Sequence, residues 1–256
     1  MIPMEITAQM FWIVCPLALL AGFIDSIAGG GGLISLPAYY LAGLPATMAA
    51  GTNKLSATMG AVLAAYNYGR SGKIERRIAA ASAAGALVCS ALGVMVMKQL
   101  SDESVRVLVM CCIPVAAVFT LRGRSGDRTQ RTFSAAGTLL ISLAIGCAVG
   151  FYDGLVGPGT GTFLILLFVH IFGLDDVRAS GTAKITNLAS NVAALSSLLL
   201  SGDVLWQLGL PAGACAMCGA WAGSRLTILK GGQFVRVMMF IVLILLLAKM
   251  ITDVLQ

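Results

Sequence analysis

The chain has 256 residues, of which 58% are hydrophobic and only 11% are charged, and its mean hydropathy is +0.92. A water-soluble domain of this length cannot bury so much apolar surface, whereas helices in a bilayer satisfy their own backbone hydrogen bonds. The formal charge of +6 lies in short breaks between apolar runs, without the broad basic face of a nucleic-acid-binding protein. Composition therefore predicts a multi-pass helical membrane protein that has the lipid bilayer, and no nucleic acid, as a partner.

Ten apolar segments follow one another along the chain, five in each half. The first five are 10–28, 33–46, 48–69, 78–97 and 105–121, and the second five are 133–152, 161–173, 179–200, 204–224 and 234–251. Most approach the ~20 residues that a spanning helix needs, but the second segment of each half has only about 13. We expect these two segments to be short or broken. No Lys or Arg precedes the first segment, which predicts that it is retained rather than cleaved as a signal peptide.

The two halves repeat each other in sequence. Gly-Phe-Ile-Asp at 22–25 recurs as Gly-Phe-Tyr-Asp at 150–153, and a glycine-rich run follows each copy. Gly-Thr-Asn-Lys at 51–54 recurs as Gly-Thr-Ala-Lys at 181–184. A collinear series of matches over both halves indicates an internal duplication. We divide the chain into a first membrane repeat (1–121), a basic cytoplasmic linker (122–132) and a second membrane repeat (133–256).

The loop charges predict how the repeats are oriented. An odd number of spans in each half inverts the second half relative to the first. The break at 70–77 is strongly basic, while its mate at 201–205 holds only Asp203. The break at 98–104 is mixed, while its mate at 225–236 is basic. Because basic loops stay cytoplasmic, we expect an all-α polytopic bundle of two inverted repeats with both termini outside. The alternative is four spans in each half and parallel repeats.

Four ionisable residues lie inside apolar segments: Asp25 and Lys54 in the first half, and Asp153 and Lys184 in the second. An ionisable group at membrane depth costs several kcal/mol unless it is paired or hydrated. One interpretation is a structural ion pair within each half, Asp25 with Lys54 and Asp153 with Lys184. The favoured interpretation places both lysines around a central cavity that attracts an anion, with the aspartates tuning the lysines or relaying protons.

The surroundings of the lysines are polar. Lys184, Asn187 and Asn191 share one face of a helix by their spacing. Each lysine follows a Gly-Thr pair, which can break a helix and leave free N–H groups that attract negative charge. The predicted anion site therefore consists of Gly51, Thr52, Asn53, Lys54, Gly181, Thr182, Lys184 and Asn187. The glycine runs after the aspartates are open to two interpretations, an anion-holding concavity of N–H groups or close helix crossing.

The sequence shows no catalytic machinery. No Ser-His-acid set or paired-carboxylate spacing emerges, and Cys215 and Cys218 have neither a second cysteine pair nor a nearby histidine, as a metal site would need. We expect a protein that is not an enzyme and that uses no metal or other cofactor.

The doubled pattern of Gly-Phe-x-Asp, a glycine run and Gly-Thr-x-Lys resembles the TauE/SafE family of sulfite and sulfonate transporters over essentially the whole chain. The resemblance implies a secondary carrier in the inner membrane that moves sulfite or another organosulfur anion. Ala183 stands where the first half has Asn53, so the halves need not contribute equally. The cargo, the direction, coupling to protons or another ion, and assembly as a monomer or homodimer stay open. The alternatives are an anion channel and, less favoured, a membrane-embedded enzyme.

Overall fold

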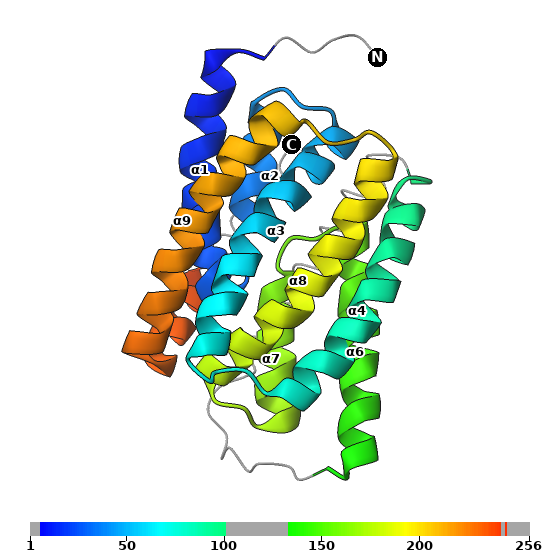
Figure 1. Ribbon diagram of the computed structural model, residues 1–256, viewed down its shortest axis with the longest axis vertical. Helices are drawn as coiled ribbons and strands as arrows, with labels where there is room; N and C mark the ends of the chain where they lie inside the picture. Colours follow the sequence, from blue (N-terminus) through cyan, green and yellow to red (C-terminus); the bar gives the residue numbers. More distant parts are fainter. Residues whose placement is uncertain (1–5, 101–132, 242–243, 245–256) are drawn as a thin grey trace.

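The structure is a computed structural model that describes residues 6–100, 133–241 and 244. Its labelled helices are α1 (Ala8–Ala28), α2 (Gly32–Leu41), α3 (Ala46–Arg70), α4 (Arg76–Met97), α6 (Ala135–Leu155), α7 (Thr160–Phe172), α8 (Asp176–Leu200) and α9 (Trp206–Lys230) (Figure 1). A short apolar helix, Gly232–Ile241, follows α9. Within these described ranges every regular element is a helix. The predicted segment 105–121 and the linker 122–132 lie outside the described residues.

The order of helices repeats between the halves. The equivalent helices are α1 and α6, α2 and α7, α3 and α8, and α4 and α9. Three described helices, α1, α4 and α6, are long and apolar enough to cross a membrane. The second helix of each half has 10 or 13 residues, a length of about 15 to 20 Å against a hydrocarbon core of about 30 Å. The prediction of a short second segment in each half is therefore confirmed.

Glycines with left-handed backbone mark the breaks before the two short helices. Gly29, which ends α1, has a φ of 78°, and Gly159, which precedes α7, has a φ of 86°. This conformation costs other residues about 1 kcal/mol or more but is freely open to glycine. The glycine runs that the sequence repeats thus turn the chain from a first helix into a short second one.

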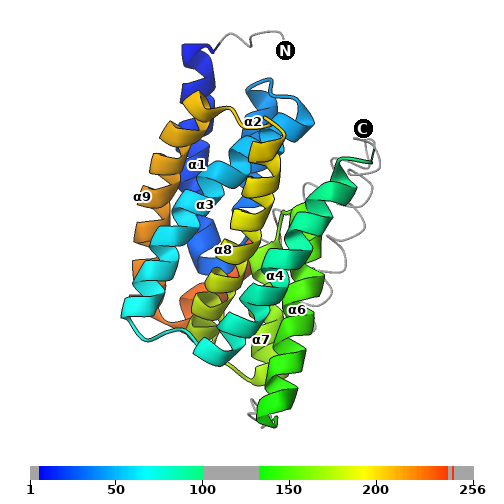
Figure 2. The same ribbon diagram turned by 45° about the vertical axis from the view of Figure 1, so that its right-hand side comes forward.

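The first helix of each half packs along the fourth helix of the other half, so that α1 lies beside α9 and α4 lies beside α6 (Figures 1 and 2). Glycines make these contacts close. A Cβ atom on Gly22 would lie 2.2 Å from the carbonyl oxygen of Ala216, and one on Gly154 would lie 2.0 Å from that of Ser90. Small residues of this kind let membrane helices approach each other backbone to backbone. Close helix crossing is therefore confirmed at Gly22 and Gly154.

Helices α3 and α8 cross at the centre of the bundle and run in opposite directions (Figure 1). Two hydrogen bonds fix this arrangement. The Thr52 hydroxyl on α3 accepts from the backbone N–H of Leu205, just beyond the end of α8, at 3.0 Å. The Thr182 hydroxyl on α8 accepts from the backbone N–H of Glu75, just beyond the end of α3, at 3.0 Å. Each Gly-Thr pair therefore docks the loop that follows the central helix of the other half.

The prediction that the Gly-Thr pairs break their helices is wrong. Both α3 and α8 are continuous through them, with 25 residues each. The physical reason is that the glycine of each pair packs against the backbone of a neighbouring loop and does not form a turn. A Cβ atom on Gly51 would lie 2.0 Å from the carbonyl oxygen of Asp203, and one on Gly181 would lie 2.1 Å from that of Lys73. The missing side chain leaves room for a loop, and the helix keeps its own hydrogen bonds.

Basic residues gather at one end of the bundle. At the lower end in Figure 1, α3 and α9 end while α4 and α8 begin. The charged residues at these helix ends and in their connections are Arg70, Lys73, Glu75, Arg76, Arg77, Asp175, Asp176, Arg178, Arg225 and Lys230. At the opposite end, Lys98 forms an ion pair with Asp203 at 3.7 Å. The basic break at 70–77 and the basic end of α9 therefore share one face of the protein.

Candidate functional site

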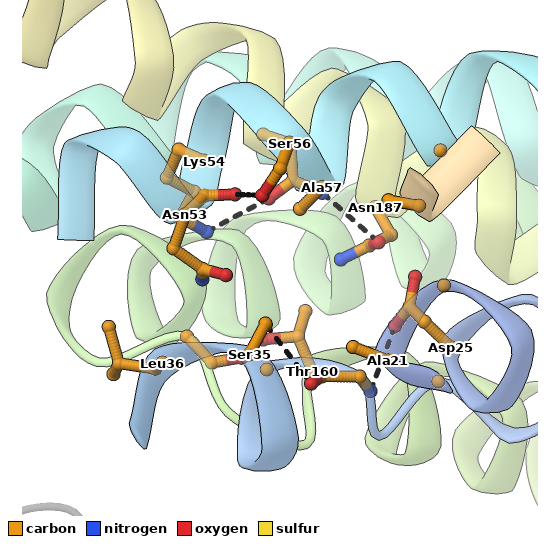
Figure 3. A pocket seen from close by; sticks show the side chains of 18 of the residues that line it. Ala21, Asp25, Ser35, Leu36, Asn53, Lys54, Ser56, Ala57, Thr160 and Asn187 are labelled. Carbon is orange, nitrogen blue, oxygen red and sulfur yellow. Dashed lines mark hydrogen bonds between the residues drawn. The ribbon is translucent and has the colours of Figure 1, made fainter. Parts of the chain in front are cut away.

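A cavity of about 60 Å³ lies at the centre of the bundle, between α1, α2, α3, α8 and α9 and the connection from α6 to α7. A site needs roughly 10 to 15 Å³ by this measure for each water molecule, so the cavity has room for a few waters or for one small oxyanion. Figure 3 shows polar side chains on both of its sides. Those that line it are Asp25, Ser26, Ser35, Asn53, Lys54, Ser56, Asp153, Thr160, Asn187 and Asn191.

Lys54 forms one ion pair at this cavity. Its Nζ lies 2.7 Å from Oδ2 of Asp153, and the two side chains are only 10% and 2% exposed. Nζ also donates a hydrogen bond to Oδ1 of Asn191 at 2.9 Å, and the Thr160 hydroxyl donates to the second oxygen of Asp153 at 2.8 Å. An ammonium group has three N–H donors. Among the residues that the structure describes, Lys54 uses two of them, which leaves one for a ligand.

Lys184 forms a second ion pair beside the cavity. Its Nζ lies 2.6 Å from Oδ2 of Asp25 and donates to the backbone oxygen of the same residue at 2.8 Å. The other carboxylate oxygen of Asp25 accepts from the backbone N–H of Gly31 at 3.3 Å. Asp25 lines the cavity, whereas Lys184 does not. The N–H group offered by this glycine run thus holds the protein's own carboxylate.

Both ion pairs connect the two halves, so the interpretation in which Asp25 pairs with Lys54 and Asp153 with Lys184 inside each half is wrong. The antiparallel crossing of α3 and α8 is the physical reason, because it carries each lysine to the helix break of the opposite half. The four groups carry two positive and two negative formal charges, which sum to zero. An anion that enters the cavity therefore adds uncompensated negative charge unless a positive charge accompanies it.

Three asparagines supply the amide groups of the cavity. Asn187 and Asn191 are 5% and 4% exposed, and Nδ2 of Asn191 donates to Oδ1 of Asn187 at 3.2 Å. Oδ1 of Asn53 is buried and has no hydrogen-bond partner in the described parts of the chain. Figure 3 shows the side chains of Asn53 and Asn187 directed into the cavity. A buried amide oxygen without a partner loses about 1 to 3 kcal/mol, so a water or another hydrogen-bond donor at this place would be stabilised.

The structure divides the predicted anion-site residues and the two predicted coupling aspartates into two groups. Those that line the cavity are Asp25, Asn53, Lys54, Asp153 and Asn187. Those outside the lining are Gly51, Thr52, Gly181, Thr182 and Lys184, of which the glycines and threonines dock loops. The threonine hydroxyls are also engaged elsewhere, since Thr52 donates to the backbone oxygen of Met48 at 2.7 Å and Thr182 accepts from Glu75.

Sequence reasoning did not place Ser35, Ser56, Thr160 or Asn191 in the predicted site, although all four line the cavity. Two of them carried a signal. Thr160 lies within the glycine-rich run of the second half, and Asn191 lies one helical turn beyond Asn187. Ser35 and Ser56 are small polar residues of a kind that is common throughout membrane helices, so nothing in the sequence distinguishes them.

A helical bundle with apolar helices long enough to span a membrane, and with buried ion pairs at its centre, is typical of a polytopic membrane protein. The family model described as sulfite exporter TauE/SafE matches residues 14–250. The chain therefore belongs to the TauE/SafE family and is a membrane transporter.

The names of similar proteins agree with this assignment. The chain is 38% identical to "Probable membrane transporter protein ORF9" of a Sinorhizobium species, over 92% of this chain and 90% of the relative. It is 34% identical to a "Probable membrane transporter protein" of Haemophilus influenzae, over 98% of both chains. It is 36% identical to "Probable membrane transporter protein YfcA" of Escherichia coli K12, over 92% of this chain and 87% of the relative. No solved structure matches the chain.

Proposed function

We propose that this protein is a secondary transporter that moves a small anion, sulfite or an organosulfonate, across the inner membrane. The observation that carries the proposal is Lys54, a buried cation that faces a small cavity and keeps one N–H donor for a ligand. Ionisable groups at membrane depth mark substrate or ion pathways. A cavity of about 60 Å³ suits a sulfite or sulfonate headgroup, whose three oxygens accept hydrogen bonds from a lysine and from asparagine amides.

The anion in this proposal binds the ammonium group of Lys54 and the amide NH₂ groups of Asn53 and Asn187. Gly31 and Gly32, at the start of α2, also line the cavity, and a helix N-terminus carries partial positive charge that favours an anion. Lys184 acts indirectly in this scheme, by compensating the negative charge of Asp25 at the cavity wall.

The proposal includes an inverted orientation of the two halves in the membrane. Its support is that each helix of the second half in Figure 1 runs opposite to its mate, as α1 descends where α6 ascends and α3 descends where α8 ascends. The common basic face at the ends of α3 and α9 is the expected cytoplasmic face of such an arrangement. Alternating access would then expose the cavity to one side of the membrane at a time.

Proton coupling completes the proposed mechanism. The two lysines and two aspartates are neutral as a set, so the arrival of one monovalent anion leaves a net charge of −1 at the site. Uptake of one proton by Asp25 or Asp153 returns the sum to zero. Protonation of Asp153 would also release Lys54 to face the anion, since the ion pair between them would be lost.

Transport by purified protein in proteoliposomes tests the proposal, with radiolabelled sulfite and ethanesulfonate as cargo. The variant Lys54→Met is expected to lose most of the flux, because the cavity loses its cation. The matched control is Lys98→Met, which removes a lysine whose ion pair with Asp203 lies at the end of α4, away from the cavity. Normal flux in a Lys54→Met protein that inserts normally would refute the assignment. Saturable flux that follows a proton gradient separates a carrier from a channel.

A further inference from the structure

We propose that Asn191 is a positioning residue that, together with Lys54, turns the N–H groups of Asn187 toward the anion. This inference rests on the proposed function and adds a specificity-determining residue to the same site. Two consecutive hydrogen bonds along the cavity wall support the inference, one from Lys54 to Asn191 and one from Asn191 to Asn187.

The direction of this chain follows from the chemistry of its first member. An ammonium group only donates, so the atom of Asn191 that lies 2.9 Å from Lys54 Nζ is the amide oxygen. The amide nitrogen of Asn191 then faces Asn187 at 3.2 Å and needs an acceptor there. Asn187 meets that need with its own oxygen, and its NH₂ group is left on the other side.

That other side is the cavity. Asn187 lines it, and Figure 3 shows the amide nitrogen of Asn187 turned into the space between α3 and the α1–α2 connection. The charge of Lys54 thus acts twice, once directly on the anion and once by fixing which end of a neighbouring amide the anion meets. An amide that was free to flip would present its oxygen half of the time and repel an oxyanion.

The two amides are features of one half alone. At the offset between the two Gly-Thr-x-Lys motifs, Asn187 and Asn191 correspond to Ala57 and Ala61. Helix α3 has the same length as α8 without either amide, so the helix itself does not need them. Ala57 also lines the cavity, which places a methyl group on the first half's side and a hydrogen-bond donor on the second half's side.

A double-mutant cycle on transport tests the inference. Asn187→Leu, Asn191→Leu and the double variant are reconstituted in proteoliposomes, and KM is measured for sulfite and ethanesulfonate. Asn187→Leu is expected to raise KM by on the order of tenfold, the typical loss for a hydrogen bond to a charged group. Asn191→Leu is expected to raise KM several-fold in the wild-type background and by less than twofold in the Asn187→Leu background. Ser196→Ala, which alters an exposed hydroxyl on the same helix, is the control and should leave KM unchanged.

Each outcome of the double-mutant cycle either supports or overturns the inference. An equal rise in KM from Asn191→Leu in both backgrounds would overturn the inference, because Asn191 would then act without Asn187. If Asn191→Leu does not fold, Asn191→Ser replaces it in the same cycle. If the wild-type protein carries neither anion, the proposed function fails and the inference falls with it, which distinguishes that failure from an additive cycle.

Discussion

The ion pair between Lys54 and Asp153 makes a quantitative prediction: removal of one partner destabilises the protein more than removal of both. At 2.7 Å and an effective dielectric constant of about 20, the attraction between two unit charges is about 6 kcal/mol before desolvation is subtracted. Both side chains are almost fully buried, so solvent screens the pair little. Loss of one partner leaves an uncompensated buried charge, which costs about 3 to 5 kcal/mol.

The variants are Lys54→Met, Asp153→Leu and the double variant, each purified in detergent and unfolded by titration with sodium dodecyl sulfate. The double variant is expected to be at least ~2 kcal/mol more stable than either single one, because replacement of a whole buried pair by apolar side chains is often close to neutral. The comparison cycle combines Lys54→Met with Asp25→Leu, and no recovery of stability is expected in that double variant. Recovery with Asp25→Leu and none with Asp153→Leu would refute the pairing across the halves.

Three further outcomes are expected. Gly51→Ala places a Cβ atom 2.0 Å from the backbone oxygen of Asp203 and is expected to lower the free energy of unfolding by about 1 to 3 kcal/mol. The control is Gly69→Ala, whose Cβ meets nothing closer than 3.6 Å. Equal stability of the Gly51→Ala and Gly69→Ala proteins would contradict the docking of the loop that contains Asp203. Thr52→Val removes the acceptor of the Leu205 N–H and is expected to reduce stability by about 1 to 3 kcal/mol while KM for sulfite stays the same; a raised KM would return Thr52 to the anion site. Accumulation of ethanesulfonate, whose charge does not change with pH, is expected to follow an imposed proton gradient and to vanish when a protonophore is added. Accumulation that persists in the presence of the protonophore would exclude proton coupling.

Properties set by local sequence were predictable. Within the described residues, the length and hydropathy of the apolar segments predicted the helices, and the short second segment of each half followed from the same count. The high cost of a charge in hydrocarbon identified Asp25, Lys54, Asp153 and Lys184 as residues that need a special environment, and the structure gives each of them an ion pair.

Properties set by contacts between distant parts of the chain were not predictable. Lys54 and Asp153 are 99 residues apart, and Lys184 and Asp25 are 159 apart, so spacing along one helix contains no information about these pairs. The Gly-Thr pairs show the same limit. A glycine before a threonine is compatible with a helix break and with a close backbone approach, and only the position of the opposite loop decides between them.

The exchange of helices between the halves bears on how this protein arose. The first helix of each half covers the fourth helix of the other, and each central helix docks the other half's loop and receives its aspartate. A single half on its own would expose bare glycine backbone to lipid and would leave its lysine without a counter-charge. An ancestor that consisted of one half would therefore have functioned only as a pair of identical chains, and gene duplication followed by fusion would have preserved that pairing inside one polypeptide.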